Sequence, residues 1–166
     1  LPAGLHGLVR IAAGTYNESF SLNHKDVIIR GAANNATILD GTGLTTSIAQ
    51  FAGSEPATAG IENLVFRNGT VGSLIYDGAP FTVGGAIYGT NSSAFIRNCR
   101  FESCSADFGG AVYLLYSRSA VDGCIFDGNT AINEAGGLFL YETTSRVANC
   151  TFTNNDTSVK GPRAGS

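Results

Sequence analysis

The sequence predicts an all-β fold, a parallel β-helix (solenoid) of about five to six coils with three short strands in each coil. Two motifs that recur in a fixed order support this prediction. The first is an aliphatic residue, any residue, Asn or Gly, Cys or Leu, any residue and Phe, with copies at 61–66, 96–101, 121–126 and 147–152. The second is a Gly-Gly pair followed by apolar residues, at 84–88, 109–113 and 136–140. Because the unit returns about every 25 residues, it is too small to bury its own apolar face and stacks on its neighbours.

The first third of the chain lacks the regular motifs but contains short apolar stretches bounded by turn residues. Alternation at Val9 and Ile11 predicts a strand that stops at Gly14, and further strands are expected within 25–31, 36–41 and 47–51. Since no segment keeps a 3.6-residue apolar period, we expect almost no helix.

The whole chain, 1–166, is expected to be a single β-helix domain. It shows no initiator Met, signal peptide or lipidation signal, so we expect a segment of a longer chain or a stacking unit. An uncapped solenoid exposes apolar core at its ends, which favours head-to-tail association of copies or contact with neighbouring domains.

Equivalent positions of the repeats are expected to form columns along the stack. The Asn or Gly of the first motif lies between inward apolar residues, so it is predicted at a bend with left-handed backbone and with amides bonded along the stack. These bend positions are Asn63, Asn98, Gly123 and Asn149. The Phe residues are expected to form a core column. The outward positions alternate in charge along Glu62, Arg97 and Asp122, and again along Arg67 and Glu102.

The distance between the two motifs is about ten residues longer in the first repeat, which indicates an inserted loop at 72–82. Insertions in solenoids leave the stack on one face, and that face is often a binding face. The loop contains Tyr76, Asp77 and Phe81 as candidate ligand contacts. A loop that only covers the coil is the other interpretation.

Four cysteines lie in the second half of the chain, at Cys99, Cys104, Cys124 and Cys150. They include no CxxC pair and no Cys/His cluster, so no metal site is predicted. Cys99, Cys124 and Cys150 share one repeat position and would lie about 5 Å apart, which permits a disulfide between neighbouring coils. We interpret the column mainly as small buried apolar side chains, with one disulfide among the three as the alternative. Cys104 occupies the position of Asn129 and Asn155 and has no partner there.

The composition limits the classes of partner. The net charge is −3 and only 14% of residues are charged, which argues against nucleic acid and anionic membranes as partners. No apolar run approaches the roughly 20 residues of a membrane span, so no membrane insertion is expected. No cofactor motif is present, and we predict no cofactor.

The opening stretches GTYNES, VIIRG and ATILDG resemble the first coils of the right-handed parallel β-helix, or pectin-lyase-like, superfamily. The later GGAIY, GGAVY, NCRF, GCIF and NCTF units resemble repeats of polymorphic outer-membrane proteins and related surface adhesins. The resemblance covers about residues 8–157 and implies a right-handed coil. It leaves function open, because this fold is used by both enzymes and inert surface proteins.

Enzymes of that superfamily carry clustered carboxylates, or acidic calcium ligands with a basic residue, on one sheet face. Asp107 and Glu134 each lie two residues before a Gly pair, so they are expected to be adjacent on the stack. Thr82 occupies the same position one coil earlier, and no third acid joins them. We therefore interpret this weak acidic pair as part of a solvated turn and predict no catalytic residue.

Six N-x-S/T sequons, more than chance placement would give, lie at Asn17, Asn35, Asn68, Asn91, Asn149 and Asn155. They indicate either a secreted glycoprotein or an Asn- and Thr-rich bacterial repeat. We expect a non-catalytic extracellular or cell-surface module, structural or adhesive, that stacks head to tail into filaments. The alternatives are a polysaccharide lyase or glycoside hydrolase, and a carbohydrate-binding module that uses Tyr76 and Phe81.

Overall fold

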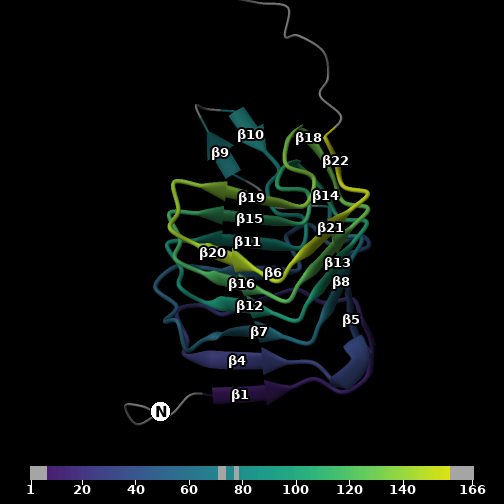
Figure 1. Cartoon of the computed structure of the whole chain (residues 1–166), viewed down its shortest axis with the longest axis vertical. Helices are drawn as coiled ribbons and strands as arrows, with labels where there is room; N and C mark the ends of the chain where they lie inside the picture. Colours follow the sequence, from purple (N-terminus) through teal and green to yellow (C-terminus); the bar gives the residue numbers. More distant parts are fainter. Residues whose placement is uncertain (1–6, 71–73, 77–78, 158–166) are drawn as a thin grey trace, which may run out of the picture.

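The computed structural model describes residues 7–70, 74–76 and 79–157, which wind into a stack of coils built from parallel sheets (Figure 1). The first sheet contains β1 (Gly7–Arg10), β4 (Val27–Arg30), β7 (Gly60–Glu62), β12 (Phe95–Arg97), β16 (Ala120–Asp122) and β20 (Arg146–Ala148). The second contains β2 (Gly14–Tyr16), β5 (Thr37–Asp40), β8 (Val65–Arg67), β13 (Arg100–Glu102), β17 (Ile125–Asp127) and β21 (Thr151–Thr153). The third contains β3 (Phe20–Ser21), β6 (Ala49–Phe51), β11 (Ile87–Thr90), β15 (Val112–Leu115) and β19 (Leu138–Tyr141).

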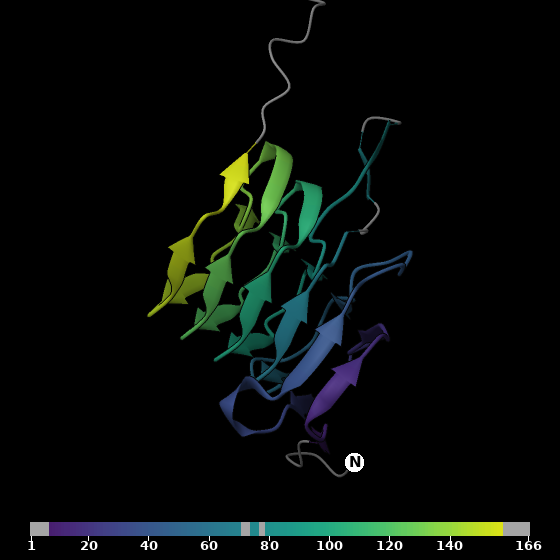
Figure 2. The same ribbon diagram turned by 90° about the vertical axis from the view of Figure 1, so that its right-hand side faces the viewer.

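Two smaller elements complete the stack. A fourth parallel sheet, β14 (Ser105–Phe108), β18 (Thr130–Glu134) and β22 (Asp156–Thr157), is confined to the later coils. The predicted insertion contains an antiparallel hairpin of β9 (Leu74–Tyr76) and β10 (Ala79–Phe81). Figures 1 and 2 show this hairpin projecting from the stack.

The parallel β-helix prediction is confirmed, with six strands in each of the first two sheets. The only helical element among the described residues is a 3₁₀ turn, η1 (Ala33–Asn35), and these residues include no helix that could cross a lipid bilayer. Three local predictions were wrong. Gly14 begins β2 rather than ending the preceding strand, β3 was missed, and so was the fourth sheet.

The predicted Phe column forms the centre of the core. Phe66, Phe101, Phe126 and Phe152 are register partners, and their successive ring centroids lie 5.2, 4.7 and 4.6 Å apart with planes within 14°. The first three rings are fully buried, whereas Phe152, in the last coil, is 48% exposed. Each buried ring is therefore covered by the coil on either side of it.

The bend positions adopt the predicted left-handed backbone, with φ of 56° at Asn63, 48° at Asn98, 64° at Gly123 and 54° at Asn149. The amide ladder expected there is not formed among the described residues. Asn149 instead donates a hydrogen bond to the Asp122 carboxylate at 2.8 Å. The reason is exposure, because Asn98 and Asn149 lie at the surface, where water and carboxylates compete for their amides.

An amide ladder forms instead inside the stack, at Asn129 and Asn155. Asn129 is fully buried, and its Nδ2 donates to Asn155 Oδ1 at 2.9 Å and to the Phe101 carbonyl at 3.0 Å. Asn155 Nδ2 donates to the Phe126 carbonyl at 2.9 Å. These bonds satisfy amides that would otherwise be buried without partners.

The cysteines are free thiols that pack in the core, which agrees with their interpretation as small apolar residues; no disulfide links Cys99, Cys124 and Cys150. Their Sγ atoms donate to the carbonyl two residues earlier, at 3.2, 3.5 and 3.1 Å respectively. Cys104 lies in the interior amide column, where its backbone N donates to Asn129 Oδ1 at 3.0 Å. Burial raises the pKa of the Cys104 thiol to about 12.

The charged columns are in register, but the ion pairs differ from those that the alternation suggested. Glu62 is a register partner of Arg97, yet its carboxylate pairs with Arg30, on the coil before it. Arg67 pairs with Asp40 at 2.8 Å, also one coil earlier. Hydrogen bonds from Thr42, and then from Arg67 and Asn68, hold the pKa of Asp40 well below its usual range.

The Phe column makes a direct prediction about stability. Phe101→Ala should lower the free energy of unfolding by about 3–5 kcal/mol, because it opens a cavity between two buried coils. Phe152→Ala, in the same column but half exposed, should cost only about 1 kcal/mol. Urea denaturation followed by circular dichroism measures both, and equal losses would contradict the covering role of the neighbouring coils.

Candidate functional site

A column of aromatic side chains lies on the outer face of the third sheet. Along this sheet Tyr88 is the register partner of Tyr113, and Tyr113 is the partner of Phe139. Their ring centroids are 6.1 and 5.3 Å apart. Strand alternation produces this arrangement, since Val112 and Leu114 are fully buried on the inner face.

The Gly-pair motif does not predict this column, because pairing Gly136–Gly137 with Gly109–Gly110 is one residue out of register. Gly109 donates from its N to the Glu134 carbonyl at 3.0 Å, so Ala135 takes the position of Gly109. The backbone confirms this equivalence, with φ of 58° at Gly109 and 55° at Ala135. Phe139, not Leu140, therefore follows Tyr113. The shared aromatic character of the three side chains was the one signal that could have corrected the alignment.

The strand register also contradicts the expectation that Asp107 and Glu134 are adjacent on the stack. Strand β18 carries one residue more than β14 between paired positions, and Glu134 becomes the partner of Phe108. Asp107 instead bonds to the preceding coil, where its Oδ2 accepts from Thr82 N at 2.7 Å and from Thr82 Oγ1 at 2.9 Å. The two carboxylates thus occupy different positions, because a bulge absorbs the extra residue.

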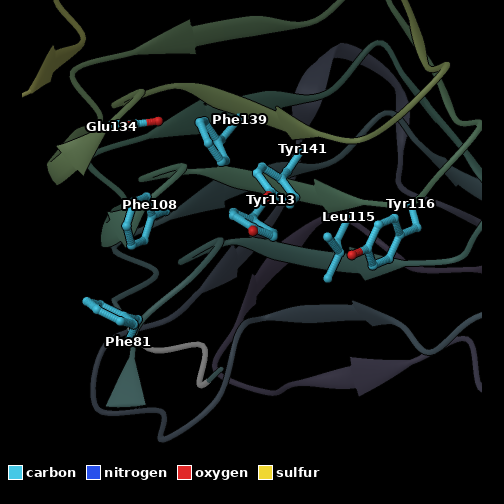
Figure 3. A pocket seen from close by; sticks show the side chains of 8 residues that line it. All are labelled: Phe81, Phe108, Tyr113, Leu115, Tyr116, Glu134, Phe139 and Tyr141. Atoms are coloured by element: carbon cyan, nitrogen blue, oxygen red, sulfur yellow. The ribbon is translucent and has the colours of Figure 1, made fainter. Parts of the chain in front are cut away.

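The outer aromatic face borders a groove with a volume of about 270 Å³. It is lined by Phe81, Phe108, Tyr113, Leu115, Tyr116, Glu134, Phe139 and Tyr141. Figure 3 shows Phe81, Phe108 and Glu134 at one end, Leu115 and Tyr116 at the other, and the remaining rings between them. Residues from the hairpin, the third sheet and the fourth sheet therefore contribute to one site.

The rings in the groove are in contact with one another. Phe81 packs edge-on against Phe108 with centroids 5.4 Å apart, and Phe108 lies 5.9 Å from Phe139. Phe139 also lies 6.3 Å from Tyr141. Phe81, predicted as a ligand-loop residue, thus reaches the groove. Asp77 and the side chain of Tyr76 lie outside the described residues.

Two polar groups of the lining, the hydroxyl of Tyr113 and the carboxylate of Glu134, have no hydrogen-bond partner in the described ranges. Tyr113 is only 6% exposed, burial raises its pKa to about 12, and its hydroxyl has no hydrogen-bond partner among the described residues. Glu134 is exposed, and within the same ranges its carboxylate makes no hydrogen bond or ion pair. No Lys, Arg or His is among the eight lining residues. Among the described residues, the groove therefore offers flat apolar faces, the phenol groups of Tyr113, Tyr116 and Tyr141, and one negative charge.

A second polar cluster, at Glu55, is structural. Glu55 is 1% exposed, and its carboxylate accepts backbone hydrogen bonds from His24, Ala52 and Gly53 at 3.1, 2.9 and 3.1 Å. These bonds tie the turn after β6 to the preceding coil. In the described part of the chain, no group of three or more His, Cys, Asp or Glu side chains could hold a metal ion.

The sequon asparagines differ in the state of their amides. Asn35 is exposed, with φ of 54° in the turn at η1. Asn17 Nδ2 donates to the carbonyls of Asp40 and Thr42 at 2.6 and 2.9 Å, and the amide of Asn155 belongs to the interior ladder. The other three amides bond to side chains: Asn68 to Asp40 at 3.2 Å, Asn91 to Thr90 at 3.2 Å and Asn149 to Asp122 at 2.8 Å.

Of the comparisons with known proteins, the one with family models agrees with this architecture. A comparison with curated proteins finds no match. The family model described as the right-handed beta helix region matches residues 15–161, which is most of the chain. Together with the parallel sheets and their coil-to-coil register, this match shows that the chain belongs to the right-handed β-helix family.

Proposed function

We propose that this domain binds an extended carbohydrate chain in its aromatic groove, as a non-catalytic module of an extracellular or cell-surface protein. The observation that supports this proposal is the aromatic column Tyr88, Tyr113 and Phe139. A pyranose ring has an apolar face of C–H groups, and this face packs well on a flat aromatic ring. A row of such rings suits a polymer of sugars better than a single small molecule.

The spacing of the column supports an extended polymer. Three successive coils each contribute one ring, at centroid separations of 6.1 and 5.3 Å, which are close to the length of one sugar unit in an extended chain. The hydroxyl of Tyr113, which no other described residue bonds, is available to bond a sugar hydroxyl at the floor of the groove. Specificity would then come from a few polar contacts on an apolar platform.

The polar groups of the groove favour binding over cleavage. Glycoside hydrolysis needs two carboxylates that flank the scissile bond, and Glu134 is the only acid among the lining residues. Elimination by a lyase needs a base and a cation that stabilises the sugar carboxylate, and no Lys, Arg or His is among the described lining residues. The lining residues thus fit neither the hydrolase mechanism nor the lyase mechanism, and this supports a module that binds its ligand without reacting with it.

A screen on a glycan array, followed by calorimetry with the polymer that binds, tests the proposal. Tyr113→Ala and Phe139→Ala should each weaken binding about fivefold, since a stacked ring contributes on the order of 1 kcal/mol. Phe152→Ala is the matched control, because it removes a half-exposed aromatic ring on a different sheet. Unchanged affinity in both groove variants, or robust cleavage of the polymer with or without calcium, would count against the proposal.

A structural role by end-to-end stacking is the second candidate. Val9 and Val147 belong to one core column and are 46% and 39% exposed. Tyr16 and Phe152 likewise belong to one column. The last described coil of one copy therefore presents the side chains that the first coil of another copy would continue, and such head-to-tail contacts grow filaments.

Stacking of this kind should appear in sedimentation velocity as association that increases with protein concentration. Val147→Lys should abolish it, because the substitution places a charge in the proposed apolar contact. Thr144→Lys, on a turn of the same coil, controls for added charge. A monodisperse monomer at high concentration would remove this candidate.

The extracellular location that we propose is supported by the six sequons, and their amides predict which of them are occupied. After expression in a eukaryotic secretory host, Asn35→Gln should remove the mass of one glycan, because Asn35 is exposed. Asn155→Gln should leave the glycan mass unchanged, because the Asn155 amide is bonded inside the stack. Intact mass measures both, and the reverse pattern would contradict this assignment.

A further inference from the structure

We infer that the glycan recognised by the groove carries free, protonated amino groups, as in a polymer of de-N-acetylated hexosamine. This inference rests on the proposed function and adds a substrate class to it. It comes from the carboxylate of Glu134, the one charged side chain among the described lining residues. That carboxylate lacks an ion-pair partner among the described residues, so it is available to a cation in the ligand.

Glu134 lies where its charge and the aromatic rings act on the same ligand group. The strand register places it beside Phe108, and Phe108 is 5.9 Å from Phe139. In Figure 3 the carboxylate points toward the side of the groove that holds Phe139. An ammonium group at this end would face a carboxylate and the electron-rich faces of aromatic rings, and both attract a cation.

Charge complementarity separates the classes of polysaccharide. A polyuronate would bring carboxylates against Glu134, and no Lys or Arg among the lining residues would offset the repulsion. The net charge of −3 acts in the same direction over a longer range. A neutral glycan would stack on the rings but leave the carboxylate unused. An amino sugar keeps the apolar ring face and adds a cation, so it can contact both the aromatic rings and the carboxylate of Glu134.

The experiment compares three hexamers by calorimetry at low salt and mildly acidic pH, where sugar amines are protonated. The hexamers are β-1,4-linked glucosamine, the same chain fully N-acetylated, and galacturonic acid. Wild-type protein should bind the glucosamine hexamer on the order of tenfold more tightly than its N-acetylated form, because the groove supplies one ion pair with cation–π contacts. The galacturonic acid hexamer should bind most weakly.

Two isosteric variants isolate the charge. Glu134→Gln should lower the affinity for the glucosamine hexamer on the order of tenfold and so abolish its preference over the N-acetylated hexamer. Glu18→Gln, an exposed acid in the first coils, is the matched control and should preserve the preference. Added salt should reduce the preference in wild type and have little effect in Glu134→Gln. Equal urea midpoints for the two variants establish that both are folded.

The outcomes distinguish this inference from the proposed function. Equal binding of the amino and N-acetylated hexamers, lost in Tyr113→Ala, would overturn the amino selectivity and retain the carbohydrate-binding groove. Equal losses in Glu134→Gln and Glu18→Gln would assign the preference to net charge and also overturn it. Tighter binding of the galacturonic acid hexamer, or no binding of any hexamer, would overturn it as well.

Discussion

Hydrogen bonding between successive coils is the constraint on which this molecule depends. Outside the β9–β10 hairpin, the strands pair in parallel with their counterparts one coil away, so residues at equivalent positions lie directly above one another. No coil is large enough to enclose its own apolar side chains, and burial is achieved only when the next coil covers it. The Phe column shows this dependence, since its rings are fully buried in the middle coils and half exposed in the last one.

The same register acts on polar and outward positions. In the interior it aligns Asn129 with Asn155, so that one amide donates to the next and each also bonds a backbone carbonyl. On the outer face of the third sheet it aligns Tyr88, Tyr113 and Phe139. Hydrogen bonding between coils thus both stabilises the core and arranges the surface that we propose for ligand binding. If one strand shifts its register by one residue, its inward and outward side chains exchange faces, and both the core and this surface change.

The groove shows how departures from the regular coil create a site. The hairpin brings Phe81 against Phe108, and the extra residue in β18 places Glu134 beside Phe108. A strictly regular stack would have neither feature. Tyr113, covered by its neighbours on both sides, has a hydroxyl with no hydrogen-bond partner in the part of the chain that the structure describes. The insertion and the bulge therefore convert a repeating face into a shaped groove, with Glu134 as the one charged side chain among its described lining residues.

The sequence by itself determined the coil, its approximate length, the Phe column and the left-handed bends at Asn63, Asn98, Gly123 and Asn149. These features follow from local patterns: the repeat period, the alternation within strands and the low cost of positive φ for Asn and Gly. Only the tertiary structure decided that Ala135 takes the position of Gly109, and that Phe139 rather than Leu140 continues the aromatic column. It also decided which acids and cations pair and which residues line the groove. The physical reason is that register is set by hydrogen bonds between coils, and a bulge can absorb one residue without a local signal in the chain.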